Sequence, residues 1–104
     1  NKVTEVKITP IKPSNGLVGF ASLVFDNSFY FGSIGIFTRP QGGYRLTYPT
    51  RKGLNGGFNV FHPINHLIAE QIEQSVISKF EEVVRTEDVV DTYVGHSGFD
   101  ARQR

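Results

Sequence analysis

The 104-residue sequence contains no cysteine, which excludes disulfides, cysteine-ligated metal sites and thiol nucleophiles. The stability of the fold must therefore come from packing. No apolar run approaches the ~20 residues that span a bilayer, and no charged start precedes an apolar stretch as it does in a signal peptide. We expect a cytoplasmic protein with no membrane partner.

Recognisable catalytic motifs are also missing. No serine lies in a Gly-x-Ser-x-Gly context, and the glycines lack the spacing of phosphate-binding or dinucleotide-binding loops. His62 and His66 are four residues apart, as in some metal sites, but no third ligand follows at a recognisable spacing and Pro63 distorts the first helical turn. We expect no catalytic residue, no metal, no cofactor and no small-molecule substrate, and hence no enzyme.

What the sequence does contain is enough for a single globular domain, with 38% hydrophobic and 20% charged residues. Its first part shows the two-residue alternation of β-strands, interrupted by turn residues. Pro10 and Pro13 are expected to end the first strand. Five strands are predicted, at residues 2–9, 17–25, 28–38, 44–48 and 58–61, with an exposed loop at residues 50–57.

The third predicted strand is rich in aromatic residues. Strict alternation divides its side chains between two faces, with Tyr30, Gly32, Ile34 and Ile36 on one and Phe29, Phe31, Ser33 and Phe37 on the other.

The period changes at Ile64. From there to about Arg85, apolar residues recur at three- and four-residue spacing, which predicts an amphipathic helix. His62-Pro63 separates this helix from the preceding strand, and Asn65 or a neighbour is expected to cap the first free amides. Residues 86–104 show no sustained period but hold several apolar side chains, so we expect a C-terminal appendage that is ordered at a dimer interface.

These elements predict an α+β domain at residues 1–85, an antiparallel β-meander of about five strands packed against one long amphipathic helix. One helix cannot cover both faces of a sheet, so dimerisation through the sheet or its edge is the simplest cover for the second face. Aromatic strands also suggest base stacking, but the interleaved basic and aromatic residues typical of such sheets are absent. Core packing is therefore the favoured interpretation for Phe29, Phe31 and Phe37.

Charge is unevenly distributed along the chain. Residues 1–60 hold seven lysines and arginines against two acids, whereas residues 61–104 are net acidic. Four of the cations lie in or beside two loops that flank one predicted hairpin, and we expect them near each other: Arg39, Arg45, Arg51 and Lys52. Two interpretations stay open, a patch that binds an anionic partner such as nucleic acid, or a solvated basic surface.

The order of three short motifs resembles the SpoVG family, bacterial regulators named for septation and sporulation. The motifs are Pro49-Thr50-Arg51-Lys52, then Gly57-Phe58 after a glycine-rich turn, then His62-Pro63-Ile64-Asn65 at the start of the helix. Three further segments resemble the family's first strand, central hairpin and helix, so that the similarity covers roughly residues 2–84: Val3-Thr4-Glu5-Val6, Leu23-Val24-Phe25-Asp26 and Ile72 to Phe80.

This resemblance implies a small homodimeric α+β protein that binds DNA and also RNA and regulates gene expression. Arg51 and Lys52 match the family's basic pair and are the expected phosphate contacts, while Arg45 and Arg39 are added on charge alone. The motif His62, Pro63 and Ile64 matches the family too, and its place between strand and helix favours a structural role. The alternative is a protein-interaction module that uses the exposed aromatic sheet surface and the C-terminal appendage.

Overall fold

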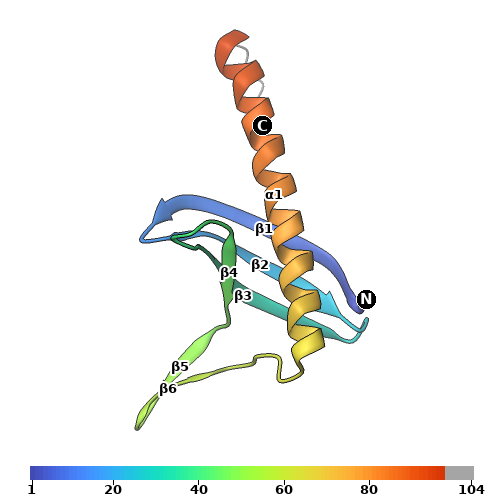
Figure 1. Ribbon diagram of the computed structural model, residues 1–104, viewed down its shortest axis with the longest axis vertical. Helices are drawn as coiled ribbons and strands as arrows, with labels where there is room; N and C mark the ends of the chain where they lie inside the picture. The colour runs from blue at the N-terminus through green and yellow to red at the C-terminus, as the bar shows by residue number, and fades with distance from the viewer. Residues whose placement is uncertain (98–104) are drawn as a thin grey trace.

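The structure is a computed structural model that describes the backbone of residues 1–97 and the side-chain environments of residues 1–86. Four strands form an antiparallel meander in the order β1-β2-β3-β4, and β5 and β6 form a separate hairpin. Helix α1 crosses one face of the four-stranded sheet, and the hairpin projects away from it (Figure 1). The predicted α+β class is confirmed. The elements are β1 (Val3–Ser14), β2 (Leu17–Phe25), β3 (Phe29–Thr38), β4 (Tyr44–Thr47), β5 (Thr50–Gly53), β6 (Gly56–Asn59) and α1 (His66–Ser97).

The core lies between α1 and the inner strands. Ile72, Val76 and Phe80 follow one another at four-residue spacing on α1 and are almost fully buried. They pack against apolar residues of the two central strands, Ala21, Leu23, Ile34 and Ile36. Burial of this apolar stripe holds the helix on the sheet.

A β-bulge at Ser33 decides which side chains of β3 face the helix. Two residues of β3, Gly32 and Ser33, stand opposite Ser22 of β2 alone, and Ser33 has a φ of 60°. The extra residue reverses the alternation, so that Phe31 and Ile34 lie on the same face. The predicted division of β3 into two faces was therefore wrong, because strict alternation takes no account of a bulge. A second bulge, at Glu5 (φ 52°), lies between Thr4 and Lys7 of β1. Val3 before the bulge and Val6 and Ile8 after it all pack against the core.

The strand β1 also continues through its two prolines, against the prediction that they end it. Pro10 pairs with Gly19, and a register irregularity follows before Ser14 pairs with Leu17. Proline is tolerated here because β1 is an edge strand, whose outward side needs no amide donor.

The segment predicted as an exposed loop at residues 50–57 instead contains β5 and the start of β6. Thr50 pairs with Asn59 and Gly53 with Gly56. Gly56 has a φ of 109°, a conformation that glycine adopts without strain. Every residue of both strands is exposed, which is why no apolar alternation marked the strand β5 in the sequence.

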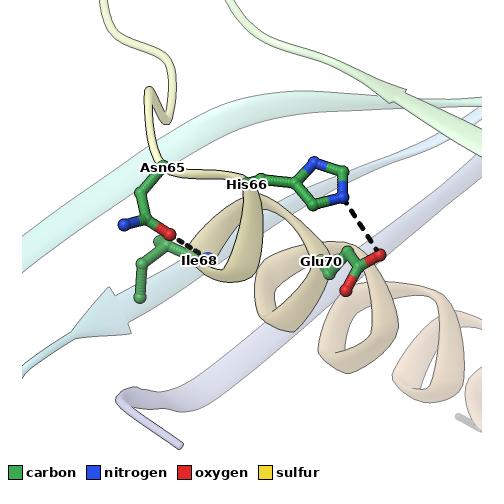
Figure 2. A network of polar contacts seen from close by, with 4 residues as sticks. All are labelled: Asn65, His66, Ile68 and Glu70. Carbon is green, nitrogen blue, oxygen red and sulfur yellow. Dashed lines mark hydrogen bonds and ion pairs between the residues drawn. The ribbon is translucent and has the colours of Figure 1, made fainter.

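The helix begins at His66, two residues after the predicted start at Ile64. The Asn65 side-chain oxygen accepts a hydrogen bond of 3.1 Å from the Ile68 amide, which confirms the predicted cap (Figure 2). The helix runs on to Ser97, past the predicted end near Arg85, because loss of the apolar period does not by itself break a helix. Residues 98–104 of the predicted appendage, and the interface expected there, lie outside the described residues. Among the residues described, no helix has both the length and the apolarity needed to cross a bilayer.

Candidate nucleic-acid interface

The hairpin of β5 and β6 presents the two basic residues of the sequence motif. Its base is fixed to the body of the protein, since the Val60 amide donates to the Pro49 carbonyl at 2.8 Å and the Asn59 amide group donates to the Tyr48 carbonyl at 3.4 Å. Beyond this base the hairpin extends away from the sheet (Figure 1). A short, exposed hairpin on a fixed base can enter a groove of a partner molecule.

Arg51 and Lys52 both lie on β5 and are exposed. As neighbours in one strand they point to opposite faces of the hairpin, so the hairpin carries a cation on each side. The chain has no aspartate or glutamate between residues 27 and 69, and neither cation belongs to an ion pair among the described residues. The positive charge of the hairpin is therefore uncompensated within its own segment.

The other two predicted site residues lie elsewhere. The Arg39 Nε donates to the Tyr44 carbonyl at 3.1 Å, and the Arg45 guanidinium lies over the Phe37 ring, 4.8 Å from its centroid. Arg45 is the second residue of β4 and Arg39 lies in the turn before it. The strand β4 leads along the chain to the hairpin (Figure 1). The structure thus places two of the four predicted cations on the hairpin and the other two in β4 or just before it, at the edge of the sheet.

A third feature is the sheet face that α1 leaves uncovered. Phe37 lies on this face, on the other side of the strand from Ile36, and Tyr30 lies there because its neighbours Phe29 and Phe31 face the helix side. Of the three phenylalanines assigned to the core, Phe31 packs against it, Phe29 is 56% exposed and Phe37 lies on the opposite face. The composition of this face was not predicted from the sequence, because the bulge at Ser33 changes which aromatic residues lie on the same side of β3.

The motif His62, Pro63 and Ile64 borders an apolar cavity of about 280 Å³ between the start of α1 and the sheet. Aromatic rings form much of its wall, and Phe31 stacks on Phe61 with 4.7 Å between ring centroids. The His62 Nδ1 lies 3.2 Å from the Pro63 carbonyl oxygen, and the structural role of this motif stays a prediction.

Two ionisable side chains, Tyr48 and His62, line the cavity. Burial raises the pKa of the Tyr48 hydroxyl from 10.0 to about 12, and the Glu73 carboxylate adds to the rise. His66 lies 3.5 Å from the Glu70 carboxylate in an exposed pair (Figure 2). In the part of the chain that the structure describes, no three histidine, aspartate or glutamate side chains gather closely enough to hold a metal.

Comparisons with known proteins agree on one family. The SpoVG family model matches residues 1–82. A relative in Phytoplasma australiense, named “Putative septation protein SpoVG”, is 36% identical over 84 residues, covering 80% of this chain and 86% of the relative. Relatives of the same name in Caldicellulosiruptor saccharolyticus and Clostridium kluyveri are 33% and 29% identical, covering 80% and 89% of this chain and 94% and 97% of their own lengths.

Proposed function

Because the chain belongs to the SpoVG family, we propose that it is a regulatory protein that binds DNA or RNA as a homodimer through basic loops, and that it is not an enzyme. The observation that carries the proposal is the projecting hairpin, with Arg51 and Lys52 exposed on its two sides and no acid in the surrounding segment. We assign the protein to the regulation of septation and sporulation.

Phosphate contact fits the chemistry of the hairpin. Cations that neutralise phosphates release condensed counterions, which supplies most of non-specific nucleic-acid affinity. A hairpin that stands away from the sheet brings these cations to a phosphate backbone without a clash from the body of the protein. Arg51 also supplies a planar group with several donors, which suits bidentate contact with phosphate oxygens.

In the proposed homodimer, the second copy adds cations for nucleic-acid binding and covers exposed apolar side chains. A single copy neutralises few phosphates and would bind weakly, whereas two copies bring twice as many cations to one surface. Large apolar side chains are exposed around the start of α1 and on the hairpin, and they provide a surface for a second copy: Phe58, Val60, Ile64 and Leu67.

A second candidate function is that of a protein-interaction module. Leu54, at the tip of the hairpin, is fully exposed, and an apolar tip suits insertion into a protein groove. In that case the flanking cations serve solubility.

Binding to labelled duplex DNA and single-stranded RNA by the Arg51→Ala/Lys52→Ala variant separates these functions. We expect affinity to fall about tenfold or more relative to wild type, because each subunit then has two fewer cations to neutralise phosphates. The matched control is Lys79→Ala/Arg85→Ala, which removes the same charge from α1 and should bind like wild type. Equal weakening in both variants, or no binding by wild type at low salt, would overturn the proposed function.

A further inference from the structure

We propose that the uncovered face of the four-stranded sheet is a stacking platform for single-stranded nucleic acid, with Tyr30 and Phe20 as the stacking residues. This inference rests on the proposed nucleic-acid binding and names the form of nucleic acid that the protein prefers.

Tyr30 is the first part of the platform. It is 72% exposed, and its ring lies against Gly32, where an added Cβ would be only 3.1 Å from Cε2 and 3.4 Å from Cζ. Because Gly32 has no side chain, the ring can lie along the strand, which leaves its other side open to solvent. An open ring face held on a strand is the geometry that a stacked base requires.

Phe20 is the second part. It pairs with Gly35 of β3 and is 39% exposed, and Gly35 also lacks a side chain that would stand beside it. An added Cβ on Gly35 would lie 3.3 Å from the Phe37 ring and 2.6 Å from the Thr47 hydroxyl oxygen. Because Gly32 and Gly35 have no side chains, no side-chain atoms project from the sheet at these two positions between the aromatic rings.

Cations lie at both edges of the face. The register places Lys7 of β1 opposite Ser22, on the same side as Phe20, and places Arg45 of β4 opposite Phe37. None of the register-paired residues of this face is an aspartate or glutamate, and the one carboxylate of β1, Glu5, lies exposed in the bulge between Thr4 and Lys7. A single strand that lies across the sheet can thus stack its bases on the central strands and place phosphates at the two edges.

This arrangement favours a single strand over a duplex. Bases in a duplex are already stacked on one another and expose only their edges, so flat aromatic rings on a sheet cannot reach their faces. It also disfavours a second copy on this face. A symmetric contact between two copies would bring the Lys7 and Arg45 cations of both copies into one interface.

The test measures binding of wild type and variants to labelled oligo-dT, oligo-rU and a duplex of equal length, by fluorescence anisotropy. We expect wild type to bind the single strands more tightly. Tyr30→Ala and Phe20→Ala should each weaken single-strand binding about tenfold, in the range of base–aromatic stacking, with little effect on the duplex. Tyr30→Phe should retain wild-type affinity, since the ring stacks without its hydroxyl.

The matched control is Phe29→Ala, which removes an exposed aromatic ring from the same strand on the helix side. It should leave single-strand affinity unchanged. Retained nucleic-acid binding that is insensitive to Tyr30→Ala and Phe20→Ala would overturn the platform and leave the hairpin proposal standing. A change of oligomeric state in Tyr30→Ala, seen by light scattering, would overturn it in favour of a second copy on this face. Absence of any nucleic-acid binding by wild type would overturn both proposals.

Discussion

The guanidinium of Arg45 lies over the ring of Phe37, 4.8 Å from its centroid, on the sheet face opposite α1. This contact covers one side of the Phe37 ring, which removes Phe37 from the aromatic surface open to a ligand. It also keeps the Arg45 guanidinium beside the Phe37 ring at the edge of the sheet, while Arg45 stays exposed to solvent. Arg45 therefore has an ordered position beside the rings of the proposed platform.

The variant Arg45→Ala tests this position. We expect weaker binding of oligo-dT and a slope of log affinity against log salt that is shallower by ~0.7, the value for one phosphate contact on a single strand. The control Arg45→Lys keeps the charge, and its salt slope should match wild type. Titrations at several salt concentrations measure both quantities. An Arg45→Ala slope equal to that of wild type would show that Arg45 contacts no phosphate.

The Asn65 cap offers a test of stability at the start of α1. Asn65→Ala removes the acceptor of the Ile68 amide and should lower the free energy of unfolding by ~1 kcal/mol. Asn65→Asp keeps a side-chain oxygen at this place and adds negative charge at the helix N-terminus, so it should unfold like wild type or later. Urea denaturation followed by circular dichroism gives the comparison. Equal unfolding of Asn65→Ala and wild type would contradict a stabilising cap.

The half-buried hydroxyl of Tyr48 predicts a loss of stability at alkaline pH. Its pKa is raised from 10.0 to about 12, so between these values the unfolded chain releases the phenolic proton while the folded chain keeps it. The free energy of unfolding should then fall as pH rises from about 10 to about 12. The slope is below the limit of ~1.4 kcal/mol per pH unit, because solvent screens a partly exposed ring.

Two variants isolate the contribution of Tyr48. Tyr48→Phe has no phenolic proton, so its stability should decline less over this pH range than that of wild type. Tyr30→Phe, which changes an exposed tyrosine, should decline as wild type does. Urea midpoints at stepped pH values measure the effect. Parallel curves for Tyr48→Phe and wild type would show that the proton of Tyr48 is not linked to folding.

Local signals in the sequence predicted the α+β class, the helix start to within two residues, and the helix cap. Asn65 follows His62-Pro63 and precedes a regular apolar period, so both the boundary and the capping group could be read directly. The motif residues Arg51 and Lys52 were also placed on an exposed segment, as the structure has them.

The missed features have physical reasons. Glu5 and Ser33 adopt positive φ values without being glycine, and nothing in their residue type marks a bulge. Because the bulge at Ser33 reverses the alternation of β3, the sequence pattern placed Phe31 and Tyr30 on the wrong sides. The strand β5 was missed since both of its faces are exposed, which leaves no apolar period to detect.

The salt dependence of duplex DNA binding tests the central claim most directly, that the hairpin cations contact phosphates. The measurement compares wild type with Arg51→Ala/Lys52→Ala over a series of salt concentrations. We expect a steep fall of affinity with salt for wild type. For the variant we expect a slope shallower by ~0.9 for each phosphate that is no longer neutralised, hence ~1.8 per subunit. Identical slopes for the two proteins would contradict phosphate recognition by this hairpin.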